Sequence, residues 1–558
     1  MSLGEVLVAK ELVSQAQLAE AQAVCEGSGN RLDRVLLKLG FVGEADLLRV
    51  LSDQFSIPVV DLLSEPIDTE LLKSMPARLI HRRRILPFAA RNGNLIVATS
   101  DPFDVFALDE LRAMTGKHVE PVLAAEREIA ALIKRYFGVG GAAIDQMMLE
   151  SGEEVHDVEV SDAALLEQAQ EATVVKLVNE ILREAINDRA SDIHFEPFEE
   201  DLRIRYRVDG VLHTTNVPEQ IKRFQAAIIS RIKIMASMNI AEKRRPQDGG
   251  FKIRHEGREI DIRVSVLPSV FGEGVVLRIL DRSAAVISLT ELGMDEDTYT
   301  AFDELINLPH GIILVTGPTG SGKTTTLYAA LNAIVSDQIK VITVEDPVEY
   351  RLMGVNQIQV HPGIDLTFAA ALRSILRHDP DVIMIGEIRD LETAEAAIQA
   401  SLTGHLVFST LHTNDACSAA TRLTDMGVEP YLVSSSVVGV MAQRLVRTNC
   451  EFCREPMTID RDKLPKDFAL EAGAVLYHGR GCRECRHTGL RGRVGLFELV
   501  PFGGEIREAI TDGASADKLL KIACRQGARM LREDGWNKVR AGLTVPDEVL
   551  RATVFQGK

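Results

Sequence analysis

Residues 311–324 read GIILVTGPTGSGKT, and this stretch decides the fold of the region around it. The segment from Gly311 to Thr316 is apolar almost throughout and is predicted to be a strand. The residues after it fit the pattern G-x-x-x-x-G-K-[ST] at every fixed position. Glycines let backbone N–H groups curl around phosphates, and the helix expected from Lys323 adds its positive N-terminal end. The sequence therefore predicts a strand, a phosphate loop and a helix.

Two side chains of this loop have expected roles in nucleotide chemistry. Lys323 would reach the β- and γ-phosphates, and the Thr324 hydroxyl would ligate Mg²⁺. A chance glycine-rich turn is the alternative, but it does not account for the strand before the loop and the helix after it. The predicted nucleotide-binding residues in this segment are Gly317, Pro318, Thr319, Gly320, Ser321, Gly322, Lys323, Thr324 and Thr325.

Two carboxylates follow apolar strands further along the chain. Glu345 comes after VITV (341–344), and Glu387 comes after VIMIG (382–386). Carboxylates at the carboxyl ends of strands face the crevice in which α/β sheets bind ligands. One could hold or polarise the metal and the other could prepare a water molecule. The alternative for both residues is an ordinary solvated carboxylate in a loop. A third acid nearby, Glu349, could equally be a surface residue without a role in the site.

A third strand ends in polar groups, in the segment GHLVFSTLHTND (404–415). Most histidines that stand alone in a sequence are structural. Two histidines beside a run of hydroxyls, His405 and His412, favour a sensor of the γ-phosphate.

Composition limits the classes of function. The 558 residues correspond to several domains, and the formal net charge of −18 disfavours nucleic-acid binding, which depends on Lys and Arg displacing counterions. No stretch reaches about 18 uncharged apolar residues, and the N-terminus lacks a signal-peptide pattern. We expect the protein to stay inside the cell, with any membrane role exerted through partners.

Four of the seven cysteines form two Cys-x-x-Cys pairs: Cys450, Cys453, Cys482 and Cys485. Paired turns of this kind supply four thiolates, and a tetrahedral set of four sulfur ligands suits a closed structural zinc site. The gap between the pairs is long, but the entropy of loop closure grows slowly with loop length. A redox dithiol is the alternative.

Together these residues resemble the secretion ATPase superfamily, the motors of type II secretion and type IV pili. The resemblance is carried by the phosphate loop, the acidic box 345–349, the segment that ends at Glu387 and the histidine box 405–412. The segments 190–194 (ASDIH), 205–210 (RYRVDG) and 241–249 (AEKRRPQDG) resemble the domain that precedes the motor core.

The resemblance implies that Glu387 is the catalytic carboxylate and that Glu345 helps with metal or water. It also implies that arginines of the preceding domain and of a neighbouring subunit neutralise the phosphates. Arg205 and Arg207 lie two apart on a predicted strand and so face one side, while Arg373 and Arg377 lie four apart on one predicted helix face. A further arginine, Arg493, matches a family position near the nucleotide. Ordinary ion-pair roles are the alternative for each of these arginines.

The predicted fold class is α/β, with a RecA-like phosphate-loop motor core, a smaller α/β domain before it, an N-terminal regulatory region and a zinc-binding insertion. The expected parts are an N-terminal secretion-ATPase domain (1–140), an acidic linker (141–173), an α/β domain supplying arginines (174–285), the RecA-like ATPase core (286–447), a tetracysteine zinc subdomain (448–500) and a C-terminal helical region (501–558).

As a member of this superfamily the chain would hydrolyse ATP with Mg²⁺, carry Zn²⁺ and form a homo-hexamer on an inner-membrane platform protein, in the cytoplasm. Segments 400–405, 426–431 and 443–447 resemble the type II secretion branch more than the alternative, pilus extension. A nucleic-acid translocase and a nucleotide switch without turnover are further alternatives. GTP is disfavoured because Asn537-Lys538 is followed by Arg540 where the guanine signature has Asp.

An internal repeat lies near the N-terminus, with units 2–25 and 31–54. Its layout resembles the tandem motif by which some of these ATPases bind cyclic di-GMP. The second unit keeps Arg31 but has Asp33 where the pattern has Gly, and the first unit departs at Ser2, Glu11 and Cys25. Because the added carboxylates would repel an anionic dinucleotide, we expect weak binding or none, and docking to the platform protein instead.

Overall fold

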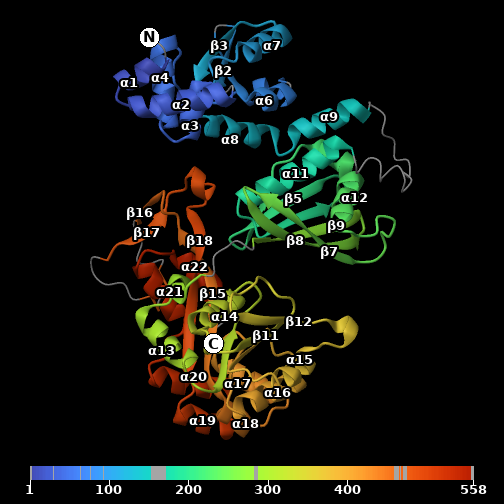
Figure 1. Cartoon of the computed structure of the whole chain (residues 1–558), viewed down its shortest axis with the longest axis vertical. Coiled ribbons are helices and arrows are strands. Elements are labelled where there is room, and N and C mark those ends of the chain that lie inside the picture. Colours follow the sequence, from blue (N-terminus) through green and yellow to red (C-terminus); the bar gives the residue numbers. More distant parts are fainter. Residues whose placement is uncertain are drawn as a thin grey trace. The chain divides into compact units, whose positions relative to one another are not determined.

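The structure is a computed structural model (Figure 1) that describes residues 3–28, 31–62, 65–75, 77–91, 93–151, 171–281, 287–457, 464–465, 467–468 and 474–553. The chain divides into two compact units, Met1–Leu280 and Asp281–Lys558. Each unit has its own sheets and its own hydrophobic cores.

The first unit begins with short helices and a small sheet. Its elements up to residue 151 are α1 (Leu3–Ala9), α2 (Gln15–Ser28), α3 (Leu32–Lys38), α4 (Glu44–Phe55), α5 (Thr69–Lys73), α6 (Ala77–Arg83), β1 (Ile85–Arg91), β2 (Asn94–Thr99), α7 (Val105–Thr115), β3 (Val119–Leu123), α8 (Glu126–Phe137) and α9 (Gly141–Ser151). The repeat units correspond to the helix pairs α1–α2 and α3–α4. The sequence RNGN at residues 91–94 is typical of a hairpin turn, and β1 and β2 do pair antiparallel with Arg91 opposite Asn94. Most of the expected acidic linker, residues 152–170, lies outside the described residues.

The rest of the first unit is a six-stranded sheet with helices on one face. Its elements are α11 (Ala172–Asn187), β4 (Asp192–Pro197), β5 (Leu202–Val208), β6 (Val211–Thr214), η1 (Glu219–Phe224), α12 (Gln225–Met235), β7 (Gln247–His255), β8 (Arg258–Ser269) and β9 (Gly272–Asp281), with strand order β6-β5-β4-β9-β8-β7. Ile204 and Tyr206 of β5 are buried against α11, and the Tyr206 hydroxyl donates to the Ile181 carbonyl at 3.1 Å. Because side chains alternate along a strand, Arg205 and Arg207 share the opposite face, as predicted.

The second unit is an α/β fold in which helices cover both faces of a central sheet. Its elements are η2 (Leu289–Leu292), α13 (Glu296–Ile306), β10 (Gly311–Thr316), α14 (Lys323–Ile334), β11 (Val341–Glu345), β12 (Val355–Gln359), η3 (Pro362–Ile364), α15 (Phe368–Ile375), β13 (Val382–Ile385), α16 (Leu391–Leu402), β14 (Leu406–Leu411), α17 (Cys417–Asp425), α18 (Pro430–Ser436), β15 (Val437–Asn449), β16 (Arg454–Met457), β17 (Leu476–Gly479), η5 (Arg483–Cys485), β18 (Leu490–Pro501), α19 (Gly504–Thr511), α20 (Ala516–Arg525), α21 (Leu531–Arg540) and α22 (Pro546–Thr553).

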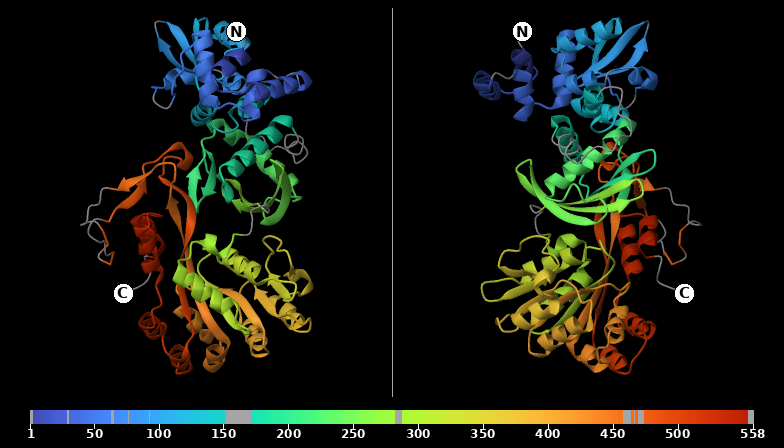
Figure 2. Two further views of the ribbon diagram at one scale, coloured as in Figure 1. Left: turned by 60° about the vertical axis from the view of Figure 1, so that its left-hand side comes forward. Right: turned by 90° about the vertical axis from the view of Figure 1, so that its right-hand side faces the viewer.

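Seven strands form the central sheet of this unit, in the order β12-β11-β13-β14-β10-β15-β18. All neighbouring pairs are parallel except β15 and β18, which are antiparallel. Helices lie on both faces (Figure 2). Ile312 and Leu314 of β10 join the core beneath α15, α16 and α17, whereas Ile313 and Val315 join the core beneath α13 and α14. Each such side chain contributes about 1.5–3 kcal/mol when fully buried, so the strand that leads into the phosphate loop is anchored on both faces of the sheet.

The cysteine-bearing segment interrupts the return to this sheet. Strand β15 leaves the sheet at Asn449, β16 and β17 pair as a separate two-stranded ribbon, and β18 re-enters as the antiparallel edge strand. The end of the segment 448–500, strand β18, is therefore part of the seven-stranded central sheet. The described residues beyond it form helices α19 to α22.

Candidate functional site

The phosphate loop has the backbone that its glycines predict. Gly317 has a φ of 152°, and a Cβ there would lie 2.5 Å from the Gln443 carbonyl oxygen. Gly322 has a φ of 89°, and its Cβ would lie 2.9 Å from the Gln443 side-chain nitrogen. The loop is therefore packed directly on β15, and larger residues at either position would displace it.

Lys323 begins helix α14 and turns back over the loop. Its Nζ donates to the carbonyl oxygens of Gly317 (2.8 Å) and Pro318 (3.2 Å). Burial lowers the pKa of Lys323, and the nearby Glu387 carboxylate raises it in partial opposition. The lysine thus lies in the concave side of the loop and within electrostatic reach of the predicted catalytic carboxylate.

Glu387 and His412 meet because the strands that precede them are neighbours. Strands β13 and β14 run parallel with Ile385 opposite Ser409, and the Thr410 hydroxyl donates to the Gly386 carbonyl at 2.8 Å. His412 Nε2 lies 3.0 Å from Glu387 Oε2. An ionised carboxylate only accepts hydrogen bonds, so the histidine nitrogen is the donor.

Arg389 is a residue of this cluster that the sequence did not single out. Its guanidinium forms an ion pair with Glu387 and lies 3.8 Å from Asp346. Burial alone would raise the pKa of Glu387, but the hydrogen bonds from Arg389 and His412 outweigh it and hold that pKa below its ordinary value. The sequence offered one local sign of this contact: Arg389 comes two residues after Glu387, so both side chains lie in the turn that follows β13.

His405 does not share this site. It lies at the opposite end of β14 from His412, roughly 20 Å away along an extended strand. Its Nδ1 is 2.8 Å from the Ala400 carbonyl and 3.1 Å from the Thr403 hydroxyl, at the end of α16. The expectation that both histidines sense a phosphate is therefore wrong for His405, which closes a helix terminus.

Glu345, the last residue of β11, is buried with 3% of its surface exposed. Its carboxylate accepts hydrogen bonds from the Tyr328 hydroxyl, from the Thr343 hydroxyl at 2.6 Å and from Gln357 Nε2 at 3.1 Å. Burial, and then the hydrogen bond between Tyr328 and Glu345, raise the pKa of the Tyr328 hydroxyl well above its ordinary value. Glu345 is thus held by α14, β11 and β12 at the edge of the site. The sequence indicated neither Tyr328 nor Gln357 as a partner.

The arginines that were predicted to neutralise phosphates lie on different elements of the two units. Arg205 pairs with Glu196 on the sheet of the first unit. Arg373 pairs with Glu392 at 2.7 Å on the surface of α15. That helix ends at Ile375, so Arg377 lies beyond it and donates back to the Arg373 carbonyl at 2.8 Å. The exposed Arg493 lies on β18, opposite Arg447.

The four cysteines of the two pairs converge, with all of their sulfur atoms within 4.8 Å of one another. The Sγ atoms of Cys450 and Cys482 lie 3.8 Å apart, and so do the Sγ atoms of Cys453 and Cys485. Zn–S bonds of about 2.3 Å in a tetrahedron require about 3.8 Å between sulfur atoms, so the set fits zinc. The backbone N–H groups of Cys482 and Gly489 point at the Cys485 sulfur, which suits a thiolate.

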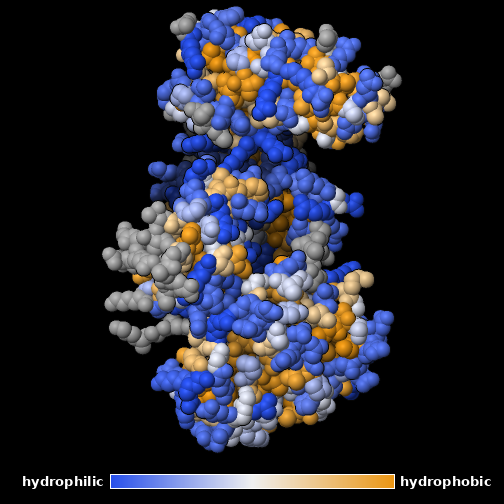
Figure 3. Space-filling model, turned by 90° about the vertical axis from the view of Figure 1, so that its left-hand side faces the viewer, coloured by the Kyte–Doolittle hydropathy of each residue, from blue (hydrophilic) through white to orange (hydrophobic). Residues whose placement is uncertain are grey.

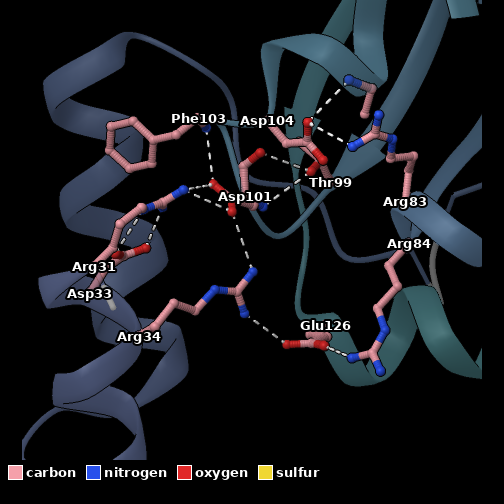
Figure 4. Close-up of polar contacts among 11 residues, drawn as sticks. Arg31, Asp33, Arg34, Arg83, Arg84, Thr99, Asp101, Phe103, Asp104 and Glu126 are labelled. Carbon is pink, nitrogen blue, oxygen red and sulfur yellow. Dashed lines mark hydrogen bonds and ion pairs between the residues drawn. The ribbon is translucent and has the colours of Figure 1, made fainter. Parts of the chain in front are cut away.

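A second polar cluster joins the second repeat unit to residues near the end of β2 (Figure 4). Arg31 Nη1 is 2.9 Å from both carboxylate oxygens of Asp101, and its other side pairs with Asp33. The guanidinium carbon also lies 4.2 Å from the centre of the Phe103 ring. The arginine that the cyclic di-GMP motif would offer to a phosphate is therefore already engaged by two carboxylates and an aromatic ring.

In the face that Figure 3 shows, hydrophobic residues form separate patches among hydrophilic ones. Among the residues that the structure describes, no helix combines the length and apolar character needed to cross a bilayer.

Comparison with known proteins finds relatives among the secretion and pilus ATPases. A family model described as type II/IV secretion system protein matches residues 167–551, and one described as the MshEN domain matches residues 55–143. The chain is 43% identical to the type IV pilus assembly ATPase PilB of Myxococcus xanthus, over 99% of this chain and 98% of that protein. It is 42% identical to the type II secretion system protein E of Xanthomonas campestris, over 98% of each. Among solved structures, the Legionella pneumophila ATPase DotB shares 22% identity over 67% of this chain and 95% of that one, with a TM-score of 0.49.

Proposed function

Because this chain belongs to the type II/IV secretion system protein family, we propose that it is the motor that powers protein export through a type II secretion system. It is a phosphate-loop ATPase. The observation that carries the hydrolytic part of the proposal is the convergence of Lys323, Glu387 and His412 at the carboxyl ends of β10, β13 and β14.

The residues have distinct roles in this proposal. The loop N–H groups and Lys323 bind the β- and γ-phosphates, and the Thr324 hydroxyl is a ligand of Mg²⁺, which neutralises phosphate charge. Glu387 accepts the proton of the attacking water, and His412 orients that carboxylate and contacts the γ-phosphate. Glu345 helps with the metal or the water from its buried position, where three hydrogen-bond donors orient its carboxylate.

The proposal also assigns roles to four arginines and to the four clustered cysteines. Arg205, Arg373, Arg377 and Arg493 contact phosphates or the neighbouring subunit of a homo-hexamer. Cys450, Cys453, Cys482 and Cys485 hold one structural Zn²⁺. The protein acts in the cytoplasm and reaches the inner membrane through platform proteins of the secretion machine, with no nucleic acid and with little or no affinity for cyclic di-GMP.

The ATPase part of the proposal is tested with the full chain and Mg·ATP. Lys323→Ala should abolish phosphate release and leave the thermal unfolding temperature nearly unchanged, because the hydrogen bonds of the lysine go to two carbonyl oxygens of its own loop. Turnover at the wild-type rate in this variant would remove the phosphate loop from the mechanism.

Pilus extension is the second candidate, because identity to the Myxococcus xanthus pilus ATPase is as high as that to the secretion protein. Deletion of the gene in its host separates the two. Loss of secreted enzymes from the medium with pili intact supports export, and loss of pili with secretion intact supports extension. Co-purification with the cytoplasmic part of the candidate platform protein gives an independent readout.

A further inference from the structure

A pocket of about 240 Å³ lies beside the first half of the phosphate loop. Three segments that are far apart in the sequence line it: the loop itself, strand β15 and the last helix, α22. The lining residues are Pro318, Thr319, Gly320, Ser321, Arg444, Leu445, Arg551 and Ala552. The C-terminal helix is therefore a wall of the cavity next to the loop.

One buried carboxylate fixes α22 in this place. Glu548 is 3% exposed, and its Oε1 accepts Arg447 Nη2 at 2.7 Å. Its Oε2 accepts the Arg447 backbone N–H at 3.0 Å and Arg551 Nη2 at 2.7 Å. The Thr544 hydroxyl donates to the Arg447 carbonyl at 2.7 Å, so the start of the helix is tied to β15 as well. Glu548 thus anchors the helix and holds Arg551 at the pocket.

Two guanidinium groups contribute to the lining of this pocket. Arg444 is bonded to the Gln443 carbonyl at 3.0 Å and to the Asn414 carbonyl at 2.9 Å, which fixes its position under the loop. The side chain of Arg551 is 51% exposed. A guanidinium carries five N–H donors, and a single carboxylate cannot use them all. An anion in the pocket would meet both positive charges and the N-terminal end of α14.

We propose that α22 completes the nucleotide site and that Arg551, together with Arg444, contacts the phosphates of the nucleotide that the loop binds. The inference rests on the proposed function of the loop as a nucleotide site. A planar fork of donors matches phosphate oxygens in pairs, which a lone ammonium cannot do. The competing interpretation is that Arg551 only forms an ion pair with Glu548 three residues earlier on the same helix.

The test measures the affinity of the full chain for Mg·ADP and for Mg·pyrophosphate by calorimetry. Arg551→Ala should weaken both by about tenfold to a hundredfold, the range expected for the loss of a charged hydrogen bond. Arg551→Lys should recover part of this loss because it restores the charge. Arg525→Ala is the matched control, since Arg525 also pairs with a glutamate on a C-terminal helix but does not line this pocket; it should bind both ligands like the wild type.

Lys323→Ala serves as the reference in the same experiment. If Lys323→Ala loses affinity and Arg551→Ala does not, the inference about α22 is overturned while the proposed function stands. If Lys323→Ala binds normally, the proposed function itself fails. A loss for ADP without a loss for pyrophosphate would overturn the phosphate contact. Thermal unfolding accompanies each measurement, and Arg551→Gln replaces Arg551→Ala if the alanine variant unfolds at a lower temperature than the control.

Discussion

The Nε2 atom of His412 lies 3.0 Å from the Oε2 atom of Glu387, although the two residues follow different strands and are separated by a full helix. The contact exists because β13 and β14 are neighbouring parallel strands, whose carboxyl ends lie at the same edge of the sheet. A carboxylate held by a histidine beside a phosphate loop is suited to accept a proton from water.

Glu387→Gln should lower kcat for ATP hydrolysis by about 100-fold to 10,000-fold, the usual contribution of general base catalysis. The affinity for Mg·ATP should stay near the wild-type value, because the loop and Lys323 are intact. Single-turnover kinetics and calorimetry measure the two effects. Glu395→Gln, an exposed glutamate of α16, is the control. Hydrolysis by Glu387→Gln at the rate of this control would assign the base elsewhere.

Arg389→Gln should move the acid limb of the pH–rate profile to higher pH. Burial raises the pKa of Glu387, and the ion pair from Arg389 is one of the two contacts that lower it. A base works only when deprotonated, so a variant with a higher Glu387 pKa loses activity earlier as the pH falls. Arg422→Gln, on the surface of α17, should leave the limb in place. A limb that moves to lower pH would contradict the assigned ion pair.

Tyr328→Phe should reduce the free energy of unfolding by about 1–3 kcal/mol, because it removes one donor from the buried Glu345 carboxylate. Glu345→Gln tests the same contact from the other side. In a double-mutant cycle the two changes should be strongly non-additive, whereas Tyr328→Phe combined with Glu395→Gln should be additive. Additivity in the first pair would show that the contact contributes nothing to stability.

Elemental analysis of the purified chain should find one zinc per polypeptide, with Cys453→Ser and Cys485→Ser each losing it. A strong chelator should lower the unfolding temperature of the wild type more than that of these variants. Cys524→Ser, an exposed cysteine outside the cluster, is the control and should keep its metal. A wild-type protein without stoichiometric metal would refute the zinc site.

Cyclic di-GMP should bind the wild-type chain weakly or not at all, because Asp33 and Asp101 already neutralise Arg31. Asp33→Gly should raise the affinity, since it restores the motif residue and frees one side of the guanidinium. Asp46→Gly makes the same change in α4, where the aspartate pairs with Arg49 instead, and should have no effect. Calorimetry that finds low-micromolar binding by the wild type would show this prediction to be wrong.

Features that depend on a short contiguous stretch of residues could be predicted from the sequence alone. The phosphate loop, the hairpin at residues 91–94 and the two Cys-x-x-Cys turns each depend on backbone geometry over a few residues, and glycines or cysteines at fixed spacing report that geometry directly. The strand before the loop follows from a short apolar run, and the helix after it follows from the context of the motif. The residues of each motif lie close together in the chain, so no knowledge of sheet order was needed to recognise them.

Only the tertiary structure decided which of the polar side chains meet. Sheet order brings His412 to Glu387 but leaves His405 at the far end of the same strand. Burial between three elements turns Glu345 into a carboxylate with three donors, and the return of the chain through α22 places Arg551 beside the loop. The energies of such contacts depend on neighbours that are tens to hundreds of residues away, and no local pattern encodes them.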